Sequence, residues 1–334
     1  MLLLSDCPER LGGLACVEDG AEAPLDSLPP GDQALWRALS TRRRLWRGTA
    51  RDPGPPGFWS RALVVAKAPG SQFDALRQAL ADGLELPGPT ASVALTGRGF
   101  HGQRGRPWAS APGNLHLCAV FPGPGLAARE ARSLPMLPVV ALVDAVRALT
   151  AGTLRPGIKW VNDVLVDGRK VGGVLTSTQV QGDRVTAVLL GIGLNVATAP
   201  PVPPTPFVPS VGCLADAGAR VTWDAAAEAV LAALGRRVSE LVDDGPAALL
   251  EAYRESSLVI GRVVCVFPDS GPGETPLGER PVPILRGTVR AITADLSLVL
   301  EGVDTPVTSG RLAFAEECAR FEPLKLVDIK MSHT

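Results

Sequence analysis

Residues 158–196 constrain the fold of this chain more than any other stretch. Three runs rich in β-branched residues, IKWVNDVLV, KVGGVLTSTQV and VTAVLLGIGLNV, are separated by the short turns DGR and QGDR. Asp-Gly and Gly-Asp between such runs are typical of β-hairpin connections. The stretch therefore predicts an antiparallel meander, and the rest of the domain has to be built around a sheet.

Segments on both sides of the meander alternate between strand and helix patterns. Residues 71–83 predict a helix, with Ser71 at the N-cap and Gly83 as the stop. Beyond Leu258 the helix patterns end, and alternating runs between turn residues predict a small β-barrel. The fold class is therefore α+β. Further strands are expected at 62–67, 91–96 and 114–121, and further helices at 137–152, 223–242 and 246–257.

Residues 1–60 lack a clear periodic pattern. Pro and Gly clusters at 28–31 and 53–57 flank an arginine-rich stretch, so we expect an irregular N-terminal segment. A solvated helix face accounts for the arginines better than contact with a polyanion, because no helix-turn-helix pattern lies nearby. No nucleic acid partner is therefore expected. The arginines concerned are Arg42, Arg43, Arg44 and Arg47.

Composition disfavours several classes of protein. The net charge of −1 gives no overall attraction to nucleic acid or to a membrane surface. Six cysteines are scattered without C-x-x-C spacing, which disfavours a zinc site and fits a reducing compartment. The opening MLLLSDCPER has no basic region before its leucines, and no apolar run approaches the roughly 18 residues of a membrane span. We therefore expect a cytoplasmic protein with no membrane partner.

A glycine-rich loop at 97–106 contains the pattern G-x-G-x-x-G. The residues that follow, PWASAPG, cannot begin the helix of a dinucleotide-binding turn, and no carboxylate lies roughly 20 residues later. A P-loop is excluded because Gln103 and Arg104 stand where Lys and Ser or Thr are required. Two interpretations remain. The loop either binds an anion through its arginines, with Trp108 stacked on a base, or is a disordered basic loop with Trp108 in the core.

Two later segments favour the anion-binding interpretation. The first hairpin carries more polar side chains than an apolar hairpin needs, namely Lys159, Asn162, Asp163 and Lys170. The third run ends in GIGLN, where glycines let the backbone approach a ligand closely. We expect loop 97–106 to be mobile without a ligand and to become ordered over a bound phosphate.

Three motifs, GRG…RGRxW, KWxND followed by GRKVGG, and GIGLNV, resemble those of the biotin protein ligases, which belong to the biotin/lipoate protein ligase superfamily. The resemblance covers about residues 62–200 and continues more weakly to the C-terminal part. It implies a catalytic domain at 61–256 similar to class II aminoacyl-tRNA synthetases, with a mixed, mostly antiparallel sheet and flanking helices. It also implies an SH3-like β-barrel domain at 257–325.

The resemblance implies an activity as well. The family makes biotinyl-5′-AMP from biotin and ATP with Mg²⁺, releases pyrophosphate, and passes the biotinyl group to a lysine of a biotin carboxyl carrier protein domain. The expected enzyme is thus an ATP-dependent biotin--[acetyl-CoA-carboxylase] ligase. A homodimer is compatible with this interpretation.

Residue roles are carried over by position in the motifs. Arg98 and Lys170 would be the catalytic cations, in contact with the biotin carboxylate and the α-phosphate. Asp163 would also be a candidate metal ligand. The residues that bind substrate or adenylate would be Gly97, Gly99, Arg104, Gly105, Arg106, Trp108, Lys159, Asn162, Asp163, Gly172, Gly173 and Asn195.

The chemistry agrees with this set of residues. A carboxylate that attacks a phosphate brings two anions together, so cations have to stabilise the charge that builds up at phosphorus. No protein nucleophile is needed, and the sequence contains no Ser/His/Asp or Cys/His pattern. His101 and His116 are therefore expected to be bystanders.

The sequence departs from the family pattern where the ring of the acid would be recognised. The family usually has Ser-Thr-Asn before the first helix, whereas this chain has Gly70, Ser71 and Gln72. Gln103 replaces a common arginine, and Val161 replaces a common proline. Biotin is the favoured substrate, and lipoate, octanoate or another small carboxylate is the alternative. A non-catalytic descendant that binds a carrier or senses the vitamin is disfavoured, because it would not need phosphate-binding cations.

Overall fold

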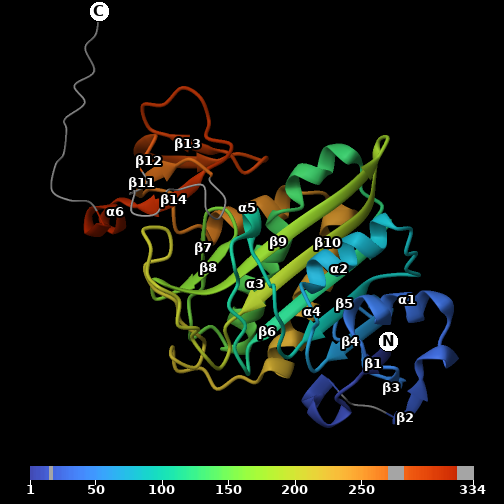
Figure 1. Ribbon diagram of the computed structural model, residues 1–334. Helices are drawn as coiled ribbons and strands as arrows, with labels where there is room; N and C mark the ends of the chain where they lie inside the picture. Colours follow the sequence, from blue (N-terminus) through green and yellow to red (C-terminus); the bar gives the residue numbers. More distant parts are fainter. Residues whose placement is uncertain (15–17, 270–281, 322–334) are drawn as a thin grey trace, which may run out of the picture.

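The computed structural model describes residues 1–14, 18–269 and 282–321. These residues form a ten-stranded sheet in the order β2-β3-β1-β4-β5-β6-β10-β9-β8-β7 (Figure 1). The pairs β1–β4 and β4–β5 are parallel, and the other neighbours are antiparallel. The expected α+β fold with a large, mostly antiparallel sheet is confirmed. In sheet order the strands are β2 (Glu18–Pro24), β3 (Arg44–Thr49), β1 (Leu2–Ser5), β4 (Arg61–Val65), β5 (Thr90–Ala94), β6 (Leu115–Pro122), β10 (Arg184–Leu194), β9 (Arg169–Gln181), β8 (Asp163–Val166) and β7 (Gly157–Lys159).

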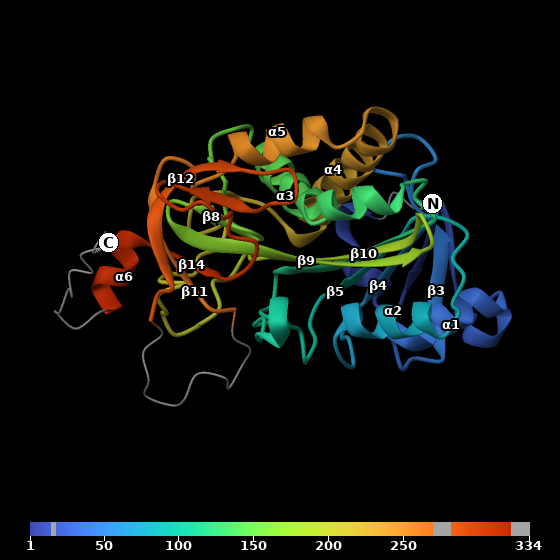
Figure 2. The ribbon, with the colours of Figure 1, turned by 90° about the horizontal axis from the view of Figure 1, so that it is seen from above.

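Helices cover both faces of this sheet (Figure 2). α1 (Pro30–Leu39) and α2 (Gln72–Ala81) lie on one face, and α3 (Met136–Leu149), α4 (Trp223–Asp244) and α5 (Ala247–Glu255) lie on the other. Strands that are covered on both faces read as continuous apolar runs, and β4, β5 and β6 are buried along almost their whole length. Short 3₁₀ helices connect the elements at η1 (Pro8–Arg10), η2 (Gly12–Leu14), η3 (Leu25–Ser27), η4 (Gln103–Gly105) and η5 (Ala128–Ser133).

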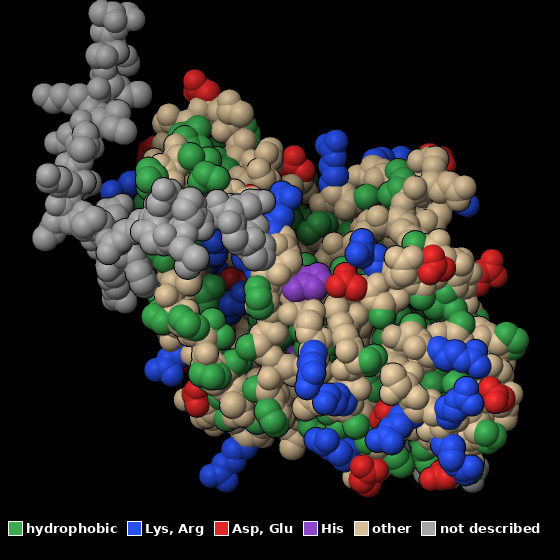
Figure 3. Space-filling model, viewed as in Figure 1, with side chains coloured by type: hydrophobic (Ala, Val, Ile, Leu, Met, Phe, Trp, Pro, Cys, Tyr) green, Lys and Arg blue, Asp and Glu red, His purple; other side chains and the backbone are tan. Residues whose placement is uncertain are grey.

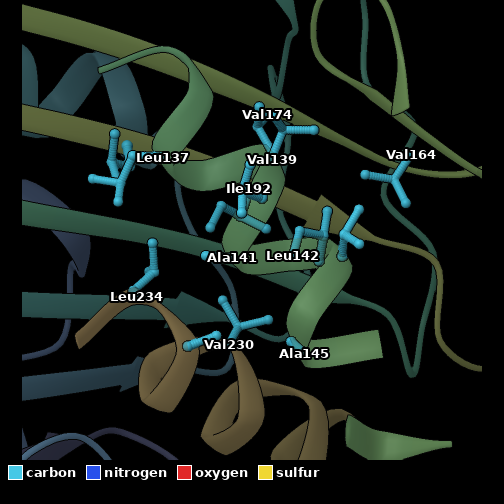
Figure 4. Close-up of a cluster of buried hydrophobic side chains, with 14 of the residues drawn as sticks. Leu137, Val139, Ala141, Leu142, Ala145, Val164, Val174, Ile192, Val230 and Leu234 are labelled. Atoms are coloured by element: carbon cyan, nitrogen blue, oxygen red, sulfur yellow. The ribbon is translucent and has the colours of Figure 1, made fainter. Parts of the chain in front are cut away.

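Helix α3 is the centre of the main hydrophobic core. Its sequence MLPVVALVDAVRAL is apolar on nearly all sides because it packs between the sheet and α4. Figure 4 shows its side chains between Ile192 of β10 and Val230 and Leu234 of α4, all of which are buried. This core holds one face of β9 and β10 in place and leaves their other face free to line a site.

Local signals in the sequence predicted the central elements correctly. Strands β7 to β10 form the expected meander. The expected N-cap of α2 is confirmed, because Ser71 Oγ accepts a hydrogen bond from the Asp74 N–H at 3.2 Å. Gly83 follows the helix with a φ of +90°, a conformation that favours glycine.

Residues 1–60 differ from the irregular segment that was expected. β1 pairs with β3 and β4, so these residues extend the main sheet and do not form a separate unit. The Pro and Gly clusters are connections, and Pro30 occupies the first turn of α1. The arginines at 42–47 lie in the turn before β3 and on β3, not on a helix face, and the four are exposed. Figure 3 shows basic side chains at the lower right of the molecule, where β2 and β3 lie in Figure 1.

The C-terminal part forms a second sheet in the order β13-β12-β11-β14. The described residues of this sheet leave β13 and β14 as separate edges, so the expected closed barrel is not confirmed. The strands are β11 (Val263–Phe267), β12 (Leu285–Ile292), β13 (Leu298–Leu300) and β14 (Arg311–Phe314), and α6 (Ala315–Phe321) follows them. Within the described ranges, no helix is long and apolar enough to cross a membrane.

Candidate functional site

A cavity of about 530 Å³ lies on the α2 face of the main sheet, next to the C-terminal sheet. The start of α2, loop 97–106, the proline-rich loop 200–211 and the first residues of β14 surround it, and β6, β9 and β10 form its floor. The sequence-predicted residues in its wall are Arg106, Trp108, Lys159, Asn162, Asp163, Lys170, Gly173 and Asn195. The motifs of the sequence therefore do converge on one cavity.

Lys170 and Asp163 form an ion pair in the cavity wall. The distance from Lys170 Nζ to Asp163 Oδ1 is 2.6 Å, and each side chain is about one fifth exposed. The backbone of Lys170 is fixed by hydrogen bonds to Ser210 and Gly212 in the proline-rich loop region. A lysine whose backbone is held and whose ammonium group faces a cavity can bind an anion without prior rearrangement of the chain.

Trp108 covers the floor of the cavity. A Cβ atom at Gly193 would lie 2.4 Å from the indole ring, and one at Gly173 would lie 3.2 Å from it. Glycine at these two positions therefore lets the indole lie directly on β9 and β10. Lys170 Nζ is 5.6 Å from the centre of the indole ring. The indole Nε1–H is buried and has no hydrogen-bond partner among the described residues.

Loop 97–106 is attached to the C-terminal sheet through its arginines. Arg104 Nε is 2.9 Å from Asp269 Oδ2, and Arg106 Nη1 is 3.4 Å from Asp269 Oδ1. Arg106 lines the cavity, whereas Arg104 is exposed. The structure does not bring Arg98 to the cavity wall, and its side chain is exposed. The remaining predicted residues outside the wall are Gly97, Gly99, Gly105 and Gly172.

Three of the predicted binding residues use their polar side chains within the protein. Lys159 donates to the Phe207 carbonyl at 2.8 Å and to Glu317 Oε2 of α6 at 3.1 Å, and it is only 3% exposed. Asn162 donates to the Val174 carbonyl at 2.7 Å. Asn195 donates to the Gly212 carbonyl at 2.9 Å. These side chains shape the cavity wall more than they offer free groups to a ligand.

His101, which was expected to be a bystander, connects loop 97–106 to α2. His101 Nε2 lies 2.7 Å from Asp74 Oδ2, and its Nδ1 lies 3.0 Å from the Gly102 carbonyl. Burial alone would lower the pKa of His101, but the hydrogen bonds to Gly102 and Asp74 and the charge of Asp74 outweigh it and raise the pKa. Burial likewise would raise the pKa of Asp74, and His101 outweighs it and lowers the pKa. The two partners are far apart in sequence, and no local pattern links them.

Two further residues line the cavity: His116, which was expected to be a bystander, and Arg311, which the sequence did not single out. His116 of β6 is 5% exposed, and burial lowers its pKa to about 4. Arg311 of β14 stacks on the Phe207 ring, with 3.5 Å between its guanidinium carbon and the ring centre. Burial lowers the pKa of Arg311 to about 10. Arg311 and Arg106 thus both place a guanidinium group in the cavity wall. No motif marks Arg311, because it lies beyond residues 62–200, which contain the three motifs.

Comparison with known proteins agrees with this geometry. The sequence profile of the Biotin/lipoate A/B protein ligase family matches residues 79–195. A biotin--[acetyl-CoA-carboxylase] ligase from Mycobacterium tuberculosis is 31% identical over 218 residues, which cover 64% of this chain and 77% of the relative. The chain belongs to the biotin protein ligase family. A similar ligase from Paracoccus denitrificans is 38% identical over 124 residues, which cover 36% of this chain and 51% of the relative.

Other members of the biotin protein ligase family match over a shorter region. The bifunctional ligase/repressor BirA of Bacillus subtilis is 34% identical over 114 residues, which are 34% of this chain and 34% of the relative. The matched region thus spans about a third of that relative's length. Among solved structures, a biotin protein ligase from Aquifex aeolicus in complex with biotin and ATP aligns with a TM-score of 0.57 at 18% identity, covering 76% of this chain and 98% of that chain. This likeness shows that the biotin protein ligase fold is present.

Proposed function

We propose that this chain is an ATP-dependent biotin--[acetyl-CoA-carboxylase] ligase. It would join biotin to AMP and then pass the biotinyl group to a lysine of a biotin carboxyl carrier protein. The observation that carries the proposal is the cavity itself. Its wall is divided between three cationic side chains, those of Lys170, Arg106 and Arg311, and apolar side chains that include Phe100 and Trp108. A cavity with this division suits a small acid that is activated by a nucleotide.

The first step would be attack of a biotin carboxylate oxygen on the α-phosphorus of ATP, with pyrophosphate as the leaving group. Lys170 would stabilise the negative charge that develops on the α-phosphate, and Arg106 and Arg311 would bind phosphate oxygens. In the second step, the carrier lysine amine attacks the acyl carbon, and AMP leaves. Loop 97–106 would keep water away from the mixed anhydride between the two steps.

The other sequence-predicted roles remain part of the proposal. Arg98 and the glycines at 97, 99 and 105 would contribute only if loop 97–106 moved toward the cavity, since they lie outside its wall here. Gly172 would act by packing, because a Cβ there would lie 2.8 Å from Leu142. We propose residues 61–256 as the catalytic domain, extended by the N-terminal strands, and the sheet within 257–321 as an accessory domain. The end of the predicted C-terminal domain, 322–325, lies outside the described residues.

The residues of the cavity fit a magnesium ion that arrives with ATP. Mg²⁺ is usually held by one or two carboxylates together with substrate phosphates. Asp163 supplies a carboxylate in the wall beside Lys170, and the nucleotide would supply the remaining oxygen ligands. When bound, the ion would withdraw charge from the phosphates. Asp163 would hold it in place and orient Lys170.

Three expectations about partners and location belong to the same proposal. The net charge of −1 supports the absence of a nucleic acid partner, although some relatives are named ligase/repressors. The six cysteines are scattered without C-x-x-C spacing, which supports a cytoplasmic location. A homodimer is compatible with the fold.

Pyrophosphate exchange across several acids tests the activity. We expect ATP–pyrophosphate exchange that depends on biotin, and transfer of labelled biotin to a carrier domain. Exchange with lipoate or octanoate but not with biotin would favour the alternative ligases. Binding of biotin without exchange would favour a non-catalytic sensor.

A further inference from the structure

The end of the cavity near α2 is lined by polar groups that mostly have partners. Ser71 Oγ is used as the N-cap of α2. Gln72 is 3% exposed, and its Oε1 accepts a hydrogen bond from Ser92 Oγ at 2.9 Å. Gln72 Nε2 donates to the backbone carbonyl of His116 at 3.3 Å. The side chains that the sequence placed at this position are therefore engaged with the protein.

His116 is the exception in this part of the wall. It is 95% buried, since only 5% of it is exposed, and its Nε2 has no hydrogen-bond partner among the described residues. On β6 it faces Ala94 of β5 on one side and Gly193 of β10 on the other, and both neighbours are small. His116 belongs to the lining of the cavity, and the Phe100 ring packs against it with 5.0 Å between the two ring centres.

The other ring nitrogen of His116 fixes the role of Nε2. Nδ1 lies 3.3 Å from the Ala94 carbonyl oxygen, which can only accept a hydrogen bond, so Nδ1 carries the proton. In a neutral ring, Nε2 is then an acceptor. Burial, which lowers the pKa of His116 to about 4, keeps the ring neutral at physiological pH. The cavity wall therefore contains a buried acceptor that lacks a donor among the described residues.

We propose that His116 Nε2 accepts a hydrogen bond from an N–H group on the ring of the acid, and that His116 determines which acid is activated. This inference rests on the proposed function. A cyclic urea, as in biotin, offers such a donor. The hydrocarbon chain of octanoate and the dithiolane of lipoate do not, so either acid would bury the Nε2 lone pair unpaired. A site built to receive a hydrogen bond discriminates strongly against ligands that lack the donor.

Two conservative variants separate this role from packing. In His116→Asn the side-chain amide can still donate to the Ala94 carbonyl, but no acceptor remains at the Nε2 position. In His116→Gln the longer amide can place an oxygen near the Nε2 position. We expect His116→Asn to raise the KM for biotin by about 10- to 100-fold with little change in kcat. His116→Gln should lie much closer to the wild type, and activation of octanoate should not weaken in either variant.

A spectrum of ¹⁵N-histidine-labelled protein gives an independent readout, because the chain has only three histidines. In the free protein, Nε2 of His116 should show the ¹⁵N signal of an unprotonated nitrogen. Addition of biotin should move this signal upfield, whereas addition of octanoate should leave it unchanged. An Nε2 that carries the proton, or equal loss of biotin and octanoate in His116→Asn, would overturn the inference.

The same experiments distinguish failure of this inference from failure of the proposed function. If the wild type activates no acid, the proposed ligase activity fails, yet calorimetric titration with biotin still tests His116 through the two variants. If the wild type activates octanoate and not biotin, both the choice of biotin and the role of His116 are wrong. If biotin is activated and the variants affect all acids alike, only the role of His116 is wrong.

Discussion

At the scale of single residues, two lysines from neighbouring motifs have different surroundings. Lys170 is about one fifth exposed, and its ammonium group faces the cavity beside Asp163. Lys159 is 3% exposed, and its ammonium group is held by Glu317 and a backbone carbonyl. Both lysines were predicted to bind the ligand. The burial of the ammonium group, and not the residue type, decides which one can act on a phosphate.

Replacement of Lys170 tests this assignment. Lys170→Ala should lower kcat for adenylate formation about a hundredfold, equivalent to ~3 kcal/mol, because it removes a charge that acts mainly in the transition state. The KM for ATP should change far less. Lys67→Ala, which removes an exposed lysine outside the cavity wall, is the matched control. Steady-state kinetics of pyrophosphate exchange measure both, and a Lys170→Ala enzyme with normal kcat would contradict the site.

At the scale of elements, the attachment of loop 97–106 to α2 depends on one titratable pair. Asp74 accepts from His101, and the pKa of His101 is raised while that of Asp74 is lowered. Because the folded-state pKa of His101 is raised and that of Asp74 is lowered, the pair contributes its full stability between the unfolded-state values of about 3.8 for Asp74 and about 6.5 for His101. This contribution is lost as the pH rises through the folded-state pKa of His101 or falls through that of Asp74. The loop should therefore be held more tightly in mildly acidic solution.

An NMR titration of His101 checks the pair. The pKa of His101 should lie above its usual value in the wild type, and Asp74→Asn should lower it, because the carboxylate that favours the charged ring is gone. Arg77→Ala, which removes a neighbouring cation, should shift the pKa slightly in the opposite direction. If Asp74→Asn leaves the titration unchanged, then the loop is not tied to α2 through this contact.

How much of the molecule could be predicted also depends on the element. α2 was predicted because its signals are local, with Ser71 and Gly83 at its ends. β1 was missed because a four-residue run becomes a strand only through pairing with β3 and β4, which lie far away in sequence. His116 was expected to be a bystander for the same reason, because its surroundings are set by Ala94 and Gly193 on two neighbouring strands. Residues within the motifs could be predicted from the sequence, whereas contacts between residues on neighbouring strands could not.

At the scale of the whole molecule, one buried ion pair joins the two sheets. Lys159 ends β7 of the main sheet, and Glu317 lies on α6, after the last strand of the C-terminal sheet. Burial lowers the pKa of Lys159, while Glu317 partly offsets this effect. Glu317 Oε2 also accepts from the Phe314 N–H at 3.3 Å, so the pair fixes the start of α6 as well. Arg311, in the cavity wall, comes only a few residues before this contact. The pair therefore helps to hold the C-terminal part of the wall in place.

Replacing one residue of the Lys159–Glu317 pair should destabilise the protein more than replacing both residues. Glu317→Gln leaves a buried ammonium group without its counter-charge, and we expect the free energy of unfolding to fall by about 3–5 kcal/mol. The double variant Lys159→Met with Glu317→Leu buries no charge, and it should recover most of that loss. Urea unfolding followed by tryptophan fluorescence measures all three proteins, and Glu316→Gln serves as an exposed control on the same helix. Equal stability of Glu317→Gln and the wild type would mean that the two sheets are held together by other contacts.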